Sequence, residues 1–228
     1  MSYILDGLRQ GAALLLPPGR EILQIIVLSL AVSGAATLIA TLAAIPAALF
    51  LALKEFRGKR LVVGLVNTAM AVPAVLIGLL VYGLVSRRGP LGALGLLFTP
   101  GAMVLAQALL AFPLMTALAL AALKGVAREA RDLALSLGAD RRQLAVAVIR
   151  QGRFAFLTAI IAGFSRVIGE TGMTLMVGGN IKGQTRVLTT AISLETMKGN
   201  FEIGIALGIV LLLAALAINI GLQLAQGK

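Results

Sequence analysis

The charged and hydroxyl side chains inside long apolar stretches are the residues most able to do chemistry in this sequence. Arg166 lies near the middle of the stretch Phe154–Val177, and Glu170 follows four residues later. Residues at that spacing share one face of a helix, so the guanidinium can pair with the carboxylate. An arginine in the middle of a bilayer costs about 2.5–3.5 kcal/mol and normally faces the bundle interior or a wet cavity. The pair either contributes to a translocation path or fixes helix packing.

Further polar residues extend this candidate path or gate. Thr174 continues the same helical face, and Thr171 and Asn180 belong to the same run of sequence. Hydroxyl and amide groups inside a membrane bundle also serve as interhelical hydrogen-bond partners, as we expect for Asn67 and Gln107. The five residues Arg166, Glu170, Thr171, Thr174 and Asn180 therefore form the predicted path or gate.

The second informative region is the polar segment Lys124–Arg153. Its 30 residues are more than most helix connections need, and the pattern predicts two short helices. Val126–Leu137 is rich in helix formers, and Gly138 then interrupts the pattern. Asp140 begins the second helix, with Gln143 three residues on as in a capping box. Two short helices bent at a glycine form either a knob that docks into another protein or a solvated connector.

Several chemistries are excluded by composition. The sequence contains no cysteine and no histidine, so it has no thiol nucleophile, no imidazole base and no metal site built from these residues. It also lacks a G-x-x-x-x-G-K-[ST] phosphate loop; the run 179–185 has the wrong spacing. We therefore expect the chain to bind no cofactor and to hydrolyse no ATP by itself.

The overall composition indicates an integral membrane protein. Hydrophobic residues make up 59% of the 228 residues and charged residues 13%, and the mean hydropathy is +1.01. A soluble fold of this size cannot bury so much apolar surface. The net charge of +11 would suit a nucleic-acid binder, but aromatic residues are only 4% and the cations lie between apolar runs. This distribution is typical of cytoplasmic loops, so we predict a membrane partner and no nucleic acid.

The predicted fold class is an all-α integral membrane bundle in one domain, residues 1–228. A hydrocarbon core of about 30 Å needs about 20 helical residues. Five stretches meet this requirement, and the first three each contain one proline: Ile25–Leu51, Leu61–Val85, Phe98–Leu123, Phe154–Val177 and Phe201–Leu224.

The basic residues predict the orientation. Segments 53–60 and 124–153 hold four and seven Lys or Arg, and these segments fall on one side of a five-span chain. The richer side is cytoplasmic, which places the N-terminus outside and the C-terminus inside. Residues 1–20 have helical amphipathic spacing and predict an interfacial helix on the outer side. Residues 178–200 form the predicted extracytoplasmic loop, with a short helix at Arg186–Met197 and a mild attraction for an anion or acidic surface.

Two groups of motifs resemble a known family. Asp132-Leu-Ala-Leu-Ser-Leu-Gly138 resembles the E-A-A-x-x-x-G signature of ABC importer permeases, with Asp and Leu in place of the first Glu and Ala. Val72-Pro-Ala-Val-Leu-Ile-Gly78 and Gly169-Glu-Thr-Gly-Met-Thr-Leu-Met-Val-Gly-Gly-Asn-Ile181 resemble the molybdate and tungstate branch. Arg186-Val-Leu-Thr-Thr-Ala-Ile192 and Gly199-Asn-Phe-Glu202 are most similar to tungstate-type permeases.

The resemblance implies a function and a set of partners. It implies the permease subunit of an ATP-driven oxyanion importer in a prokaryotic inner membrane, with tungstate as the cargo. Two copies would form the pathway, a solute-binding protein would deliver the anion, and ATP and Mg would bind to ABC ATPase subunits. The residues of the family's ATPase-coupling loop would be Asp132, Ala134, Ser136, Leu137, Gly138, Ala139 and Asp140.

Three alternatives stay open at this stage. The first alternative is that the cargo is molybdate or sulfate. It stays open because such tetrahedral anions differ little and selectivity is expected to lie in the binding protein. A secondary transporter would use Arg166 and Glu170 as a proton relay, but the sequence has no inverted repeat. A structural membrane scaffold would need neither the docking segment nor the charges within the membrane.

Overall fold

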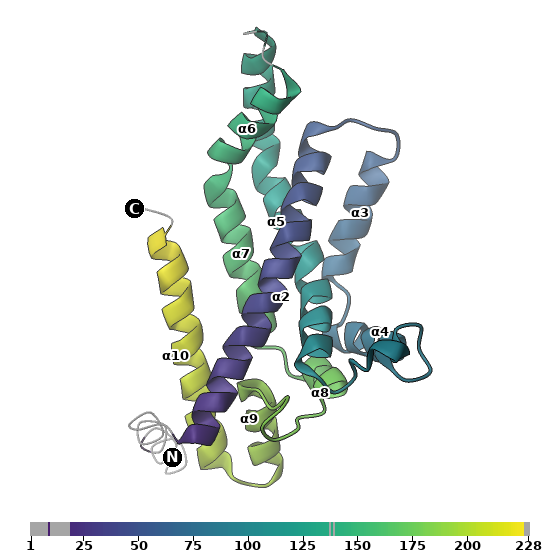
Figure 1. Ribbon diagram of the computed structural model, residues 1–228. Helices are drawn as coiled ribbons and strands as arrows, with labels where there is room; N and C mark the ends of the chain where they lie inside the picture. Colours follow the sequence, from purple (N-terminus) through teal and green to yellow (C-terminus); the bar gives the residue numbers. More distant parts are fainter. Residues whose placement is uncertain (1–8, 10–18, 137, 139, 226–228) are drawn as a thin grey trace.

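The computed structural model describes residues 9, 19–136, 138 and 140–225, and this part of the chain is helical with no β-strand (Figure 1). The N-terminal interfacial helix predicted over residues 1–20 lies almost wholly outside the described residues. The elements are α2 (Arg20–Leu53), α3 (Lys59–Met70), α4 (Ala74–Val85), the 3-10 helix η1 (Gly92–Leu94), α5 (Pro100–Ser136), α6 (Arg141–Gln151), α7 (Arg153–Ile168), α8 (Gly172–Gly178), α9 (Leu188–Met197) and α10 (Phe201–Ala225).

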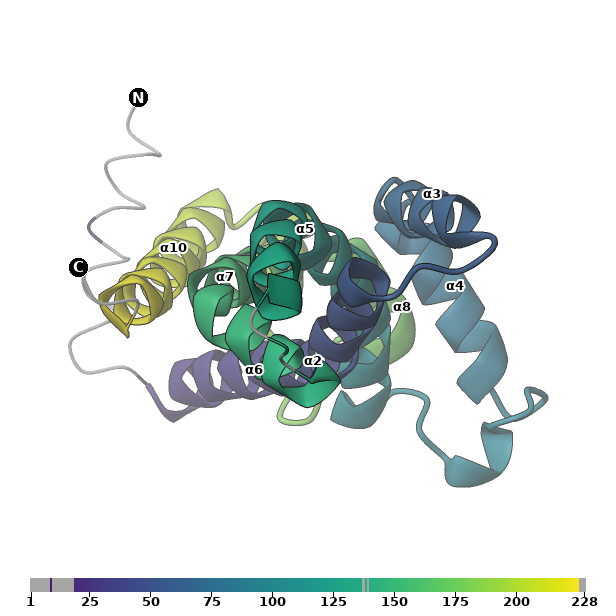
Figure 2. The ribbon, with the colours of Figure 1, turned by 90° about the horizontal axis from the view of Figure 1, so that it is seen from above.

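Helices α2, α5 and α7 form the packed centre of the bundle. Seen from above, α10 lies on one side of this group and α3 and α4 lie on the other (Figure 2). Fully buried small residues such as Ala36, Ala44 and Ala111 let the helix backbones approach closely, while Met103 and Met115 fill the remaining space. The small hydroxyl residues Ser29, Ser33 and Thr37, which recur every fourth position on α2, are also buried, each at most 5% exposed.

The second predicted span is wrong as a continuous helix. The chain bends by 99° between α3 and α4, and the break falls at Ala71–Pro73. Val72 precedes a proline, which disfavours the helical conformation, and Pro73 becomes the N-cap residue of α4. By contrast, Pro46 and Pro113 lie inside the continuous helices α2 and α5.

The fourth predicted span is also wrong in its last third. Helix α7 ends at Ile168 and the short helix α8 begins at Gly172, so Phe154–Val177 is not one helix. At its other end α7 meets α6 at a bend of 60° next to Gly152. A side chain at Gly152 would approach Leu123 Cδ2 to 2.6 Å, so the glycine allows this corner to pack against α5.

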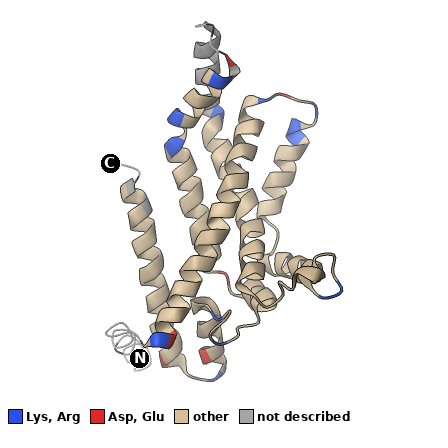
Figure 3. Cartoon of the chain, in the orientation of Figure 1, with Lys and Arg blue, Asp and Glu red and all other residues tan. Residues whose placement is uncertain are grey.

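Three described helices are long and apolar enough to cross a membrane: α2, α5 over Pro100–Lys124, and α10 over Phe201–Gly221. The count rises to five if the bent pairs α3–α4 and α6–α7 each form one span. The α2–α3 turn and the α5–α6 tip lie at one end of the bundle, and the start of α2 and helices α8 and α9 lie at the other (Figure 1). Lys and Arg residues lie mostly toward the two ends, and few lie between them (Figure 3).

Candidate functional site

The predicted charge pair forms at the corner where α7 ends. Arg166 Nη1 lies 3.1 Å from Glu170 Oε2. The Glu170 side chain is 11% exposed, whereas that of Arg166 is 44% exposed in the single chain. The predicted pairing is thus confirmed. Its setting differs from the prediction, because Arg166 lies in the last turn of α7 and Glu170 lies beyond the helix end.

Glu170 also connects three segments through hydrogen bonds. Its Oε1 accepts a hydrogen bond from the backbone N–H of Met173 at 3.3 Å, in the first turn of α8. Its backbone carbonyl accepts one from the Thr189 hydroxyl of α9 at 3.1 Å. A carboxylate suits the positive end of α8, and a guanidinium suits the negative end of α7. The corner therefore has complementary charges at both helix ends and holds α7, α8 and α9 together.

Of the other three predicted path residues, only Thr171 adjoins this corner. Thr171 is the half-buried N-cap residue of α8. Thr174 is 1% exposed, and its hydroxyl lies 3.5 Å from Gln107 Nε2 of α5, so it contributes to helix packing rather than continuing a face of α7. Asn180 follows the other end of α8 in the left-handed conformation, with φ 52°. The structure thus brings Arg166 and Glu170 into contact, with Thr171 beside them, and leaves Thr174 and Asn180 elsewhere on α8 and beyond its end.

The loop from α8 to α9 depends on hydroxyl groups that sequence reasoning missed. The Thr185 hydroxyl donates to the carbonyl of Gly178 at 2.5 Å and accepts from the N–H of Ile181 at 2.9 Å. The Ser29 hydroxyl accepts from the N–H of Leu188 at 2.8 Å, which ties the start of α9 to α2. The Thr185 bonds are local and resemble a turn signal, but no sequence signal connects Ser29 to a residue 159 positions away.

The second candidate site is the tip formed by the end of α5 and the start of α6. Gly138 has φ 69°, a left-handed conformation that favours glycine. Asp140 Oδ1 accepts hydrogen bonds from the N–H groups of Arg142 and Gln143, both at 2.8 Å. Gln143 Oε1 accepts in return from the N–H of Asp140 at 2.9 Å, so the predicted capping box is confirmed.

The first half of the tip differs from the prediction in one respect. The helix predicted over Val126–Leu137 is not separate, because α5 runs without a break from the membrane span to Ser136. Asp132, Ala134 and Ser136 lie on these last turns of α5, where the structure describes the backbone. Leu137 and Ala139 lie outside the described residues.

The opposite end of the bundle carries its own carboxylates. Glu195 accepts hydrogen bonds from Lys198 Nζ at 2.7 Å and from Asn200 Nδ2 at 2.8 Å. These two hydrogen bonds, with a smaller contribution from the positive charges of Lys198 and Arg186, lower the pKa of the Glu195 carboxyl. Among the described residues no group of three or more acidic, histidine or cysteine side chains is placed to hold a metal ion.

Comparison with known proteins identifies the family. The profile of the family described as binding-protein-dependent transport system inner membrane component matches residues 40–227. The chain belongs to this family. It is therefore a membrane component of a transport system rather than a catalytic enzyme.

Two of the relatives match nearly the whole chain, and a third matches about three quarters of it. A tungstate uptake system permease protein of Peptoclostridium acidaminophilum is 42% identical over 96% of this chain and 96% of its own length. The protein of that name from Campylobacter jejuni is 38% identical over 96% of this chain and 92% of its own length. A molybdenum transport system permease protein of Escherichia coli is 30% identical over 74% of this chain and 77% of its own length.

Proposed function

We propose that this chain is the permease subunit of an ATP-driven importer for tungstate in a prokaryotic inner membrane. The observation that carries the proposal is the 42% identity to a tungstate uptake permease, which extends over 96% of both chains. Molybdenum permeases are also relatives, at 30% identity over a shorter region, and make molybdate the second candidate cargo.

Two copies of the chain form the transport unit. In support, α3 has no buried residue in the single chain, and its Leu61 and Leu65 side chains are 68% and 60% exposed. So much apolar surface requires either lipid or a protein partner. Transport then consists of switching between two packings of the paired bundle, with the direction set by the state of the partners.

Energy enters at the tip, where an ABC ATPase subunit docks on residues 124–153 of each copy. ATP and Mg bind to that partner, and this chain binds no cofactor. The geometry supports docking because α6 starts at a stable cap on Asp140 and meets α7 at the 60° bend. A push on α6 would therefore reach α7, whose last turn carries Arg166, the partner of Glu170 just beyond the helix end. We assign these two residues, with Thr171, Thr174 and Asn180, to the path or its gate.

The outer end receives the anion from a solute-binding protein. This assignment places the start of α2 outside and the end of α10 in the cytoplasm. The chain contains no cysteine, so single introduced cysteines test the orientation cleanly. A membrane-impermeant maleimide should label Lys198→Cys in intact cells and Arg142→Cys only after permeabilisation. The reverse pattern would invert the proposed topology.

The function is tested by measuring tungsten and molybdenum in cells grown with equal tungstate and molybdate. Deletion of the chain should lower cell tungsten, and a plasmid copy should restore it only when the ATPase gene is intact. Loss of molybdenum alone would make molybdate the cargo. Restored tungsten in the absence of the ATPase would favour a secondary transporter.

A further inference from the structure

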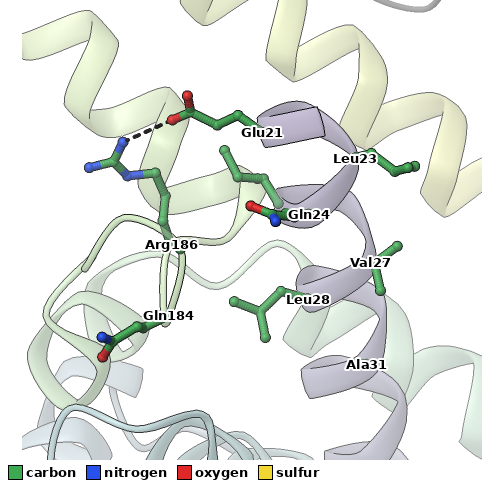
Figure 4. A pocket seen from close by; sticks show the side chains of 10 residues that line it. Glu21, Leu23, Gln24, Val27, Leu28, Ala31, Gln184 and Arg186 are labelled. Carbon is green, nitrogen blue, oxygen red and sulfur yellow. Dashed lines mark ion pairs between the residues drawn. The ribbon is translucent and has the colours of Figure 1, made fainter. Parts of the chain in front are cut away.

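A cavity of about 420 Å3 opens at the outer end of the bundle, away from the charge pair and the tip. One wall is the first three turns of α2, and the other is the loop before α9 that carries Gln184 and Arg186. Gln24 and Leu28 point from α2 toward this loop (Figure 4). The cavity thus lies where a membrane-spanning helix begins, at the level of the lipid headgroups.

The lining from α2 changes from mixed to apolar along the helix, since Leu23 and Ile25 accompany the polar residues only at its start. Glu21 and Gln24 lie at the outer end, and Val27, Leu28 and Ala31 follow deeper along the helix. From Glu21 to Ala31 the helix rises about 15 Å, which is half of a hydrocarbon core. A ligand that fits this lining has a polar group at the outer end and a long apolar part.

Three charged groups meet at the polar end of the cavity: Glu21 and Arg186 line it, and Lys182 lies outside the lining but pairs with Glu21. Lys182 Nζ lies 2.7 Å from Glu21 Oε2, and Arg186 Nη1 lies 3.6 Å from Glu21 Oε1. One carboxylate therefore serves two cations, and the second contact is long. Arg186 Nε is buried and has no hydrogen-bond partner among the described residues. A buried donor without a hydrogen bond costs free energy, and the planar guanidinium matches the oxygens of a phosphate.

We propose that this cavity binds one anionic phospholipid, with its phosphate at Arg186 and Lys182 and an acyl chain along Val27, Leu28 and Ala31. The single negative charge of a phosphodiester complements two cations that share one carboxylate. A free oxyanion would satisfy the same cations but would leave the apolar wall in contact with water. The lipid would hold the start of α2 against the loop that leads into α9.

The test is native mass spectrometry of the full chain released from nanodiscs that contain equal phosphatidylglycerol and phosphatidylcholine. The wild-type chain should retain phosphatidylglycerol in preference. Arg186→Gln should reduce this retention about tenfold, as expected for the loss of one charged hydrogen bond. Ala31→Trp should also reduce it, by filling the apolar part without changing any charge. Lys198→Gln is the matched control, because it removes a cation at the same end of the bundle but outside the cavity lining, and it should retain the lipid.

Three results would overturn the proposal. If Arg186→Gln and Ala31→Trp each retained as much phosphatidylglycerol as the wild-type chain, the cavity would not select this lipid. Binding of tungstate or orthophosphate to lipid-free chain, lost in Arg186→Gln and kept in Ala31→Trp, would make this a free-anion site. Spontaneous disulfide dimers of Val27→Cys would show that a second copy covers the groove.

Discussion

Two carboxylates, one at the tip and one just beyond the end of α7, accept hydrogen bonds from the first turn of a helix. Asp140 caps α6, and all the hydrogen bonds of its side chain are to residues within three positions. Glu170 binds the first turn of α8, but it also pairs with Arg166 of α7 and accepts a hydrogen bond from Thr189 of α9. The same local chemistry thus serves one exposed helix end in the first case and a junction of three segments in the second.

The difference between local contacts at Asp140 and long-range contacts at Glu170 distinguishes a role in partner docking from a role in folding. A residue whose contacts are all local can be changed without disturbing the bundle. Its substitution should therefore weaken binding of a docking partner rather than folding. A residue that joins distant segments should affect assembly before it affects transport. The charge pair and the tip therefore make opposite predictions in assays of assembly and of activity.

The largest effect is expected at Glu170. Glu170→Leu removes the α8 contact and leaves Arg166 unpaired. Breaking a buried pair costs about 3–5 kcal/mol, and because Arg166 is 44% exposed we expect about 2 kcal/mol here. The measurement is the yield and thermal stability of the purified chain. Glu170→Gln is the matched control, since the amide oxygen still accepts a hydrogen bond from the N–H of Met173. It should lose less thermal stability than Glu170→Leu.

The double variant Arg166→Leu with Glu170→Leu then separates the two roles of the pair. Removing both charges leaves no unpaired ion, so assembly should recover relative to the single variants. If the pair also contributes to the path, tungstate uptake should remain low. Full uptake by the double variant would show that the pair only holds the bundle together.

A smaller effect on stability, with a large effect on coupling, is expected at the tip. Proline cannot adopt the φ of 69° found at Gly138, so Gly138→Pro should redirect the start of α6. Asp140→Lys removes the cap, at a cost of about 1 kcal/mol. Both chains should remain folded in the membrane and lose co-purification with the ATPase.

The matched control at the tip is Asp140→Asn, because asparagine caps helices nearly as well as aspartate. It should retain the ATPase. Undiminished complex formation and transport in both Gly138→Pro and Asp140→Lys would exclude this segment as the docking site.

The smallest effect is expected at Glu195, in the last turn of α9. Its pKa is lowered from 4.5 in the folded chain, so its stabilisation is present above pH 4.5 and is lost as the pH falls through the folded pKa. Glu195→Gln should remove this acid-dependent loss at a cost of about 0.5 kcal/mol near neutral pH. Thermal unfolding of both chains from pH 7 to pH 3 measures it. Parallel curves over this range would contradict the assignment.

The sequence was sufficient for the features that depend on local spacing. The apolar lengths predicted the long spans α2, α5 and α10, and the Asp140 and Gln143 pair predicted the cap. The spacing of Arg166 and Glu170 correctly predicted their contact, but the helical geometry behind that prediction is not present. The i, i+4 rule assumes a continuous helix, whereas here the chain turns at Gly169 and the two side chains still meet.

What the sequence did not show depends on contacts between distant segments. The breaks after α3 and α7 lie inside runs that are apolar throughout, so hydropathy alone cannot locate them. The partners of Glu21, Ser29 and Thr189 are separated from them by 19 to 165 positions, and no local pattern marks such pairs. The resemblance motifs identified the run that contains Glu170, but only the structure shows that Glu170 joins three helices.

In the proposed mechanism, energy reaches this membrane bundle from an ATPase docked at the tip. The most direct test is tungstate uptake into proteoliposomes that contain the chain, the ATPase and the solute-binding protein. Uptake should require ATP, should stop with a non-hydrolysable analogue, and should be absent with Gly138→Pro while the wild-type chain is active. Uptake driven by a proton gradient in proteoliposomes that contain this chain alone would contradict the account.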